Sequence, residues 1–251
     1  MLTVLGGGGW FPANGRQTAC ALLRRGDAAI MIDAGTGVGR FVEDPGLLAG
    51  VERLDIVLTH FHLDHVVGLA YLPALGVSRQ TTLWGPGRLL YDAPTQELVD
   101  LVSHEPFHPV PFEAQDIEVR DLPAHEIELA GMRVTTRRQS HHSAPTLGFR
   151  FDDTLTWITD TAYDPDSAQF AQGSALLAHE AWYTTARPRN ETIHSAAAEA
   201  ASVASAAEVE QLLLIHLPPF EQSLDAILFE AREHAAHVTL AQEGAGLPVA
   251  A

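Results

Sequence analysis

Short runs of apolar residues, separated by glycine, proline and polar turns, make up most of the hydrophobic pattern of this chain. Runs that alternate or stay apolar over about four to eight residues are typical of β-strands. The pattern therefore predicts strands at 2–5, 18–24, 28–33, 54–59, 82–85, 117–122, 132–138, 146–151, 155–159, 175–179, 212–215 and 238–241. The second and third runs flank Arg25-Gly26-Asp27, which predicts a hairpin.

Helical spacing of apolar residues appears in the longer stretches between these strands. It predicts helices around 38–48, 66–75, 88–102, 167–172, 195–209 and 224–236, with a frayed tail after Gly244. No linker, repeat or low-complexity segment interrupts the pattern, so we expect residues 1–251 to form a single domain. Strand-rich halves that each close with helices predict an α+β fold, with two β-sheets packed face to face and helices outside them.

Composition narrows the class of protein. An apolar content of 46% with modest charge is typical of a soluble globular chain. Cys20 is the only cysteine, which excludes an intramolecular disulfide and a cysteine-rich zinc module. The first residues show no signal-peptide pattern, and no apolar run is long enough to cross a bilayer. We therefore expect a cytoplasmic protein without membrane contact.

The charge balance disfavours some partners and chemistries. Fifteen arginines and no lysine stand against 32 acidic residues, which gives a formal net charge of −17. Such a protein repels polyanions, so extended contact with nucleic acid is not expected. The absence of lysine also excludes a P-loop lysine and Schiff-base chemistry. The glycines at 6–9 are accordingly predicted to form a tight turn beside the active site rather than a nucleotide-binding loop.

A dense group of metal-ligand residues follows the apolar run at 54–58. In the sequence Thr59-His60-Phe61-His62-Leu63-Asp64-His65, four potential ligands lie within six residues. His60 and His62 are two positions apart, so an extended backbone points both imidazoles to the same side. Asp64 and His65 come where the strand must end, and can point to a neighbouring place. This spacing favours two adjacent metal ions over one, and over a histidine-rich turn without a metal.

Further ligand-type residues follow other predicted strands. His141-His142 comes after 132–138, Asp160 ends the run at 155–159, and His216 follows 212–215. A lone histidine or aspartate at such a place is more often structural. Together with the first motif, however, these residues supply five imidazoles and two carboxylates, which suffice for two metal ions with one bridging carboxylate.

The ordered set of motifs resembles the metallo-β-lactamase superfamily. Its His-x-His-x-Asp-His signature is met at residues 60, 62, 64 and 65, and the remaining segments resemble the ribonuclease Z-like phosphodiesterase branch. These segments are His142-Ser143-Ala144-Pro145-Thr146-Leu147-Gly148-Phe149-Arg150, Thr159-Asp160-Thr161, His179-Glu180-Ala181 and His194-Ser195. The resemblance implies the four-layer αβ/βα fold of that superfamily, with two mixed β-sheets.

The resemblance also implies roles for individual residues. His60, His62 and His142 would hold one metal ion; Asp64, His65 and His216 would hold the other; Asp160 would bridge them. His142 is preferred to its neighbour His141 because Pro145 follows it at the spacing of the family segment. His141 is then a candidate for supporting the site or contacting the substrate. His194 resembles the catalytic histidine, and Asp64 is a second catalytic candidate that accepts a proton from the attacking water. Glu180 is expected to support the site from behind the ligands.

The implied cofactors are two divalent metal ions, with zinc expected and manganese or iron also suited to these ligands. The implied reaction is hydrolysis by attack of a metal-bridging hydroxide. Members of the family are often dimeric, which makes a homodimer the first assembly to look for.

The chain departs from the ribonuclease Z pattern in a way that bears on the substrate. The tRNA-binding arm of those enzymes would lie between His142 and Asp160, which are only 18 positions apart here. We therefore expect a small phosphodiester, of the cyclic nucleotide or cyclic ribose phosphate type. Arg138 and Arg187, like the adjacent Arg137 and the nearby Arg189, are candidates for contact with such an anion. Alternatives are a lactone, thioester or aryl sulfate ester as substrate, tRNA 3′ processing, and a non-catalytic metal-binding regulator.

Overall fold

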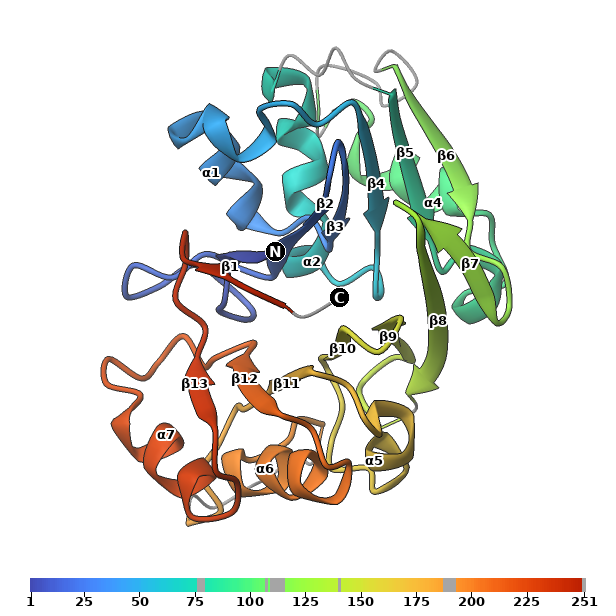
Figure 1. Cartoon of the computed structure of the whole chain (residues 1–251). Coiled ribbons are helices and arrows are strands. Elements are labelled where there is room, and N and C mark those ends of the chain that lie inside the picture. Colours follow the sequence, from blue (N-terminus) through green and yellow to red (C-terminus); the bar gives the residue numbers. More distant parts are fainter. Residues whose placement is uncertain (76–79, 107, 109–115, 140, 187–192, 250–251) are drawn as a thin grey trace.

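Two β-sheets face each other in the structure, and helices cover their outer sides (Figure 1). This computed structural model of the chain describes residues 1–75, 80–106, 108, 116–139, 141–186 and 193–249. The strand order of the first sheet is β14 (Gly246–Leu247), β1 (Leu2–Gly6), β2 (Cys20–Arg25), β3 (Ala28–Ile32), β4 (Arg53–Val57), β5 (Gln80–Gly85), β6 (Ile117–Asp121). The order of the second is β13 (Val238–Leu240), β12 (Gln211–Ile215), β11 (Leu176–Glu180), β10 (Leu155–Ile158), β9 (Thr146–Phe151), β8 (Met132–Gln139), β7 (Glu126–Leu129). The predicted fold class is confirmed.

Each sheet is mixed, and its parallel part determines where polar side chains can gather. Strands β3, β4, β5 and β6 are parallel, as are β10, β11, β12 and β13. Because the carboxyl ends of parallel strands lie at one edge of a sheet, the residues that follow these strands are brought to one edge. Six of the seven predicted ligands follow β4, β10 and β12, whereas His142 follows the antiparallel strand β8.

Burial on both faces explains the continuous apolar runs. In β3, Ile30 and Ile32 point into the core between the two sheets, while Met31 points into the core between the first sheet and its helices. The inner core also contains the fully buried Phe149 and Trp157 of the second sheet. A strand covered on both faces loses the alternation of apolar and polar residues, so its sequence becomes an apolar run.

Most of the helices are shorter than predicted, and prolines interrupt the helical pattern in three of the predicted stretches. They are α1 (Arg40–Glu43), α2 (Leu63–Val66), α3 (Gly87–Leu90), α4 (Thr95–Val102), α5 (Asp166–Ala171), α6 (Ala197–Ala206) and α7 (Asp225–Arg232), with 3₁₀ turns at Thr36–Gly39, Pro45–Leu48 and Val67–Leu75. The prediction of one helix over 88–102 is wrong, because Pro94 directly precedes α4 and α3 ends before it. Pro45 and Pro73 likewise lie in 3₁₀ turns within the two helices predicted at 38–48 and 66–75.

Two further differences concern strands. The prediction of a frayed tail after Gly244 is wrong, because β14 pairs with β1 through Leu247 and Leu2. Strand β7 was not predicted, since its sequence Glu126–Leu129 is half acidic and pairs only at the edge of the second sheet. Among the described residues, no helix combines the length and apolar character needed to cross a membrane.

Candidate metal centre

The first motif occupies the turn between β4 and α2. The N–H of Leu58 still donates to the carbonyl of Trp84 in the neighbouring strand, at 3.0 Å, but the chain then leaves the sheet. His60 lies in the turn and is fully buried. His62 is the residue before α2, in extended conformation with φ −65° and ψ 148°, and the helix carries Asp64 and buried His65. The predicted change from strand to helix within the motif is therefore what separates its two pairs of ligands.

A buried carboxylate behind the motif fixes two of its histidines. Asp33, at the end of β3, accepts hydrogen bonds from the backbone N–H of Thr59 at 2.8 Å and from its hydroxyl. Asp33 Oδ2 also lies 2.8 Å from His65 Nδ1, and Thr59 Oγ1 lies 3.0 Å from His60 Nδ1. With both Nδ1 atoms engaged, the Nε2 atoms of His60 and His65 are directed to the opposite side.

The remaining ligands come from the second sheet, at the points where its strands end. Asp160 lies two residues after β10, and His216 directly after β12, with φ values of +51° and +47°. Such values are uncommon for residues other than glycine, and cost of order 1–3 kcal/mol unless the surroundings hold them. Part of that support is visible at Asp160, whose carbonyl accepts from Thr146 Oγ1 at 3.1 Å. His142 is held by its Nδ1, which donates to the carbonyl of Ile193 at 2.8 Å.

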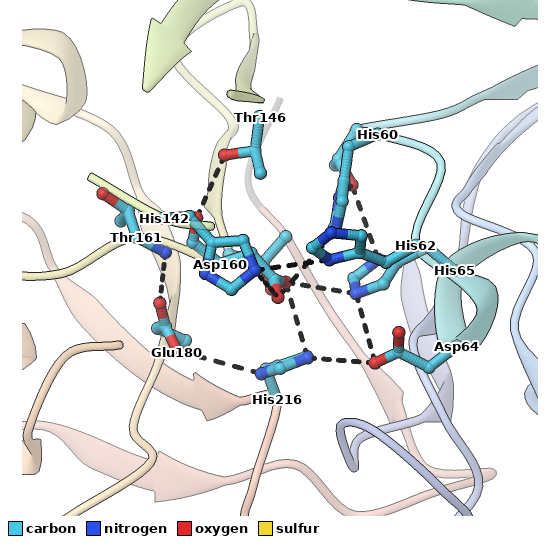
Figure 2. Close-up of polar contacts among 12 residues, drawn as sticks. His60, His62, Asp64, His65, His142, Thr146, Asp160, Thr161, Glu180 and His216 are labelled. Carbon is cyan, nitrogen blue, oxygen red and sulfur yellow. Dashed lines mark hydrogen bonds and ion pairs between the residues drawn. The ribbon is translucent and has the colours of Figure 1, made fainter. Parts of the chain in front are cut away.

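These side chains converge on Asp160 (Figure 2). Its Oδ1 lies 3.5 Å from His142 Nε2 and 3.9 Å from His60 Nε2. Its Oδ2 lies 3.1 Å from His65 Nε2 and 3.4 Å from His216 Nε2. Potential metal-donor atoms fall within 4.8 Å of one another in three groups: His60, His62, His142 and Asp160; Asp64, His65 and His216; and Asp160, His194 and His216. The two oxygens of Asp160 thus face different groups of imidazoles.

The chemistry of this donor set fits divalent metal ions. His60 Nε2 and His65 Nε2 are buried and have no hydrogen-bond partner in the described part of the chain. Burial, reinforced by neighbouring His65, lowers the pKa of His60 well below its usual value, so its ring is neutral with a free lone pair. Burial alone would raise the pKa of Asp160, but the facing His216, His65 and His60 outweigh it and keep that carboxyl ionised. Buried, unpaired nitrogens around an ionised carboxylate are what a cation would satisfy.

His194 lies beside this cluster and is oriented by Glu180. The segment that carries His194 is bound to the residues after β11, since Trp182 N–H donates to the Ser195 carbonyl at 2.9 Å. His194 Nδ1 lies 2.7 Å from Glu180 Oε2, and the other oxygen of Glu180 accepts from Thr161 N–H. Trp182 stacks on the His194 ring, with centroids 4.6 Å apart and planes at 20°. Burial lowers the pKa of His194. The pKa of Glu180 is raised to about 8, mainly by burial and secondly by the charge of Asp160. Glu180 is thus fully buried and contacts His194 and Thr161, and it is not among the residues that line the pocket described below.

Two other predicted site residues, His141 and Arg138, do not join the described cluster. The side chain of His141 is 57% exposed, and its Nδ1 is 3.9 Å from Asp164 rather than near Asp160. A residue that supports the site would be buried against the ligands, whereas His141 is exposed. His142 is the member of the doublet whose side chain faces Asp160. Arg138 is exposed on β8, and the adjacent Arg137 is engaged with Asp164 and Ser167. Arg187, like Arg189, lies outside the described residues.

A pocket of about 360 Å³ opens over the cluster. It is lined by Trp10, His62, Asp64, His142, Ser143, Asp160, Trp182, Tyr183, Ile193, His194 and His216. Neither the aromatic residues that line the pocket, Trp10, Trp182 and Tyr183, nor the role of Asp33 was predicted from the sequence. The available signals were weak: Asp33 ends a buried strand, and Trp10 directly follows the glycines at 6–9. Those glycines do lie against the site, since a Cβ at Gly9 would meet the His216 ring at 2.4 Å.

The sequence pattern of the beta-lactamase superfamily domain matches residues 28–217 of this chain. The chain belongs to the β-lactamase superfamily. Two proteins with similar sequences are Ribonuclease Z of Methanopyrus kandleri and the probable metallo-hydrolase YhfI of Bacillus subtilis. The first is 25% identical and covers 97% of this chain and 96% of its own length; the second is 24% identical and covers 87% of each.

Solved structures agree on the fold of this superfamily member. The crystal structure of the metallo-β-lactamase fold protein YhfI from Bacillus subtilis superposes with a TM-score of 0.78 at 23% identity, covering 97% of both chains. A diphosphatase from the PhnP family gives a TM-score of 0.72 at 21% identity, covering 98% of this chain and 96% of its own. The predicted metallo-β-lactamase fold, the ribonuclease Z-like resemblance and the general class of hydrolase are thereby confirmed.

Gly9→Ala is expected to weaken metal binding without unfolding this β-lactamase superfamily chain. The added methyl group would lie 2.4 Å from His216 Cε1 and Nε2, so the ring must move. Displacing a ligand ring through its surroundings typically costs 10–100-fold in metal affinity. Titration with a metal ion under competition from a chelator would measure the change. Gly39→Ala is the control, because nothing lies within 4 Å of its Cβ position; equal affinities in the two variants would contradict the prediction.

Proposed function

We propose that the chain is a dinuclear-metal phosphodiesterase that hydrolyses a small phosphodiester. The observation that carries this proposal is the position of Asp160, whose two oxygens face two separate groups of imidazoles. In the proposed centre, His60, His62 and His142 would hold one ion, Asp64, His65 and His216 would hold the other, and Asp160 would contribute to both. Two such ions, with zinc expected, would polarise the phosphoryl oxygen and lower the pKa of a bound water.

His194 is the proposed source of the proton for the leaving oxygen. Its Nδ1 is engaged by Glu180, which leaves Nε2 to the pocket that His194 lines. Burial lowers the pKa of His194, and the charges of Asp160 and Asp64 offset only part of that effect, so the ring gives up its proton readily once it is protonated. A general acid must reach the leaving atom while its other nitrogen is held in a fixed orientation, and the pairing with Glu180 provides that orientation.

Asp64 is proposed to position the attacking water and take up its proton. Its Oδ2 accepts the N–H of Trp10 at 2.7 Å and lies 3.4 Å from His216 Nε2. These contacts fix the carboxylate plane at the pocket wall, which Asp64 lines. Burial alone would raise the pKa of Asp64, but His65 and His216 outweigh it and lower that pKa, so the carboxylate is ionised and is placed to accept a proton.

A small substrate is favoured over tRNA by the shape and the charge of the chain. The residues between His142 and Asp160 are occupied by β9, a tight turn and β10, which leaves no room there for an RNA-binding arm. The formal net charge of −17 opposes an extended polyanion. None of the described residues that line the pocket is an arginine, so within the described part of the chain the positive charge available to a phosphate is that of the histidines, together with the proposed ions.

The test is a comparison of kcat/KM for the zinc-loaded protein on four chromogenic or coupled substrates: bis-p-nitrophenyl phosphate, a lactone, a thioester and an aryl sulfate. The proposal expects the phosphodiester to be preferred by at least about tenfold, with activity lost in chelator. Preference for one of the other three would overturn it in favour of that ester class. Cleavage of a tRNA precursor, with retardation in a gel, would overturn the small-substrate part.

A further inference from the structure

Three exposed aromatic side chains stand together at the mouth of the pocket. Trp10, Phe11 and Phe220 are 61%, 40% and 56% exposed. Their rings contact one another edge to face, with centroids 5.3 Å apart for Trp10 and Phe11 and 5.5 Å apart for both pairs that include Phe220. Trp10 also lines the pocket that contains the metal-ligand cluster. An exposed apolar patch that continues into a polar pocket is typical of a ligand-binding surface.

The backbone fixes these rings in place although they come from distant parts of the sequence. The loop at 7–17 and the segment at 217–221 are joined by hydrogen bonds from Gly9 N–H to the Leu217 carbonyl at 3.1 Å, and from Leu217 N–H to the Gly7 carbonyl at 2.9 Å. Side chains reinforce the connection. Asn14 Nδ2 donates to the Pro219 carbonyl at 2.8 Å, and the Arg16 guanidinium donates to the carbonyl of Pro218 at 2.9 Å.

The backbone conformation of Trp10 is a second, independent indication that this surface is preorganised. Its φ is +64°, a left-handed conformation that is unfavourable for a bulky residue. The N–H of this strained residue donates to Asp64 Oδ2, a proposed metal ligand, at 2.7 Å. The hydrogen bond holds the Trp10 backbone, from which the indole projects, beside the ligand cluster, and strain held beside a site points to a role in that site.

We propose that Trp10, Phe11 and Phe220 form an aromatic platform that binds a planar aromatic group of the substrate next to the scissile ester. This inference rests on the proposed phosphodiesterase function and names the substrate class more closely: an ester of phosphoric acid with an aryl or nucleobase-bearing group. Flat π-surfaces bind planar rings of many kinds by stacking and edge contacts, without requiring hydrogen bonds. The rings are fixed before binding, so little side-chain entropy is lost when a ligand docks.

The experiment measures dissociation constants for matched phosphates by calorimetry, using the zinc-loaded full chain. One pair is adenosine 5′-monophosphate and ribose 5-phosphate; the other is phenyl phosphate and methyl phosphate. The aromatic member of each pair is expected to bind about tenfold more tightly or better, as for one stacked ring. A preference in both pairs supports the shared aromatic chemistry, and a preference confined to the nucleotide pair supports a nucleobase as its source.

The variant to compare is Phe11→Ala/Phe220→Ala, in which the preference should fall toward onefold while the non-aromatic members bind as before. Phe11→Leu/Phe220→Leu retains apolar area without planar rings, and should also lose most of the preference. Phe229→Ala removes a phenylalanine on α7 that is more exposed than either of these two and is not part of the platform, and should leave the preference unchanged. Zinc content and melting temperature confirm that each variant is folded.

Failure of the two proposals would look different. If methyl phosphate and phenyl phosphate bind equally, and the nucleotide pair does likewise, the platform is overturned while phosphate binding and the proposed function stand. If no phosphate binds the zinc-loaded protein and no phosphodiester is cleaved, the proposed function is overturned, and the platform proposal with it. If the double variant changes the molar mass measured by light scattering and leaves the preference intact, the platform is an interface between copies of the chain, which also overturns the proposal.

Discussion

Asp160→Ala is expected to lose bound metal and activity together, with kcat/KM falling by roughly 10³-fold or more. Asp160 is the only residue whose oxygens face both proposed ligand groups among the described residues. Without Asp160, the four imidazole nitrogens that face it would no longer be accompanied by a negative charge that balances the charge of a bound cation. The two proposed ions would also lose the carboxylate that they share. Metal assistance contributes several kcal/mol to such reactions, and each 1.36 kcal/mol corresponds to a factor of ten in rate.

The measurement is zinc content by elemental analysis, together with hydrolysis of bis-p-nitrophenyl phosphate, for Asp160→Ala and Asp160→Asn. Asn retains the shape of the side chain but not its charge, so it separates loss of the anion from loss of packing. Asp164→Ala is the control, because Asp164 is another largely buried carboxylate nearby that pairs with Arg137 instead of the cluster. An Asp160→Ala protein that kept both ions would show that Asp160 does not bridge them.

The sequence contained enough to find the strands and the ligand-type residues that follow them. Every strand predicted from an apolar run lies within two residues of its predicted bounds. Because an apolar run that ends in His or Asp places that residue at a strand end, Asp160 and His216 were recognisable one segment at a time. The same local pattern identified His60 and His62. These features depend on neighbouring residues, which is the range over which hydrophobic periodicity operates.

What could not be predicted depends on contacts between distant segments. Asp33 orients His65 because β3 and β4 are paired, and nothing near Asp33 in the sequence shows that it will face an imidazole. The aromatic platform joins Trp10 to Phe220 across 210 positions, through hydrogen bonds between two loops. The positive φ values of Asp33, Asp160 and His216 aim their side chains into the site, and non-glycine residues in this conformation leave no simple sequence signal.

The helix errors have a different origin. Apolar spacing is the same whether a segment forms one helix or two short ones, so the pattern at 88–102 did not reveal the break. The break lies before Pro94, where proline restricts the preceding residue and cannot donate a hydrogen bond. The break does not disturb the site, because none of the proposed metal ligands lies on α3 or α4.

His194→Ala is expected to lower kcat by roughly 10²–10⁴-fold, the usual contribution of a general acid, while both metal ions remain bound. The reason is the position of the ring: its Nδ1 is paired with Glu180 at 2.7 Å, and Trp182 covers one face at 4.6 Å. This arrangement holds a proton donor in a fixed orientation beside the proposed ions. Glu180→Gln keeps the packing but weakens that orientation, and should cause a smaller loss, of about 10–100-fold.

The same variant tests a competing assignment, because His194 also falls in a potential donor group with Asp160 and His216. If His194 were a metal ligand, His194→Ala would lose about one ion per chain, and kcat would fall as a consequence of that loss. If it is the proton donor, zinc content stays at two ions, and the loss in kcat is smaller for a substrate with a good leaving group such as p-nitrophenolate than for an alkyl ester. His141→Ala is the matched control, since its side chain is largely exposed and should affect neither quantity. A His194→Ala protein with full zinc and unchanged kcat on an alkyl phosphodiester would remove His194 from the mechanism.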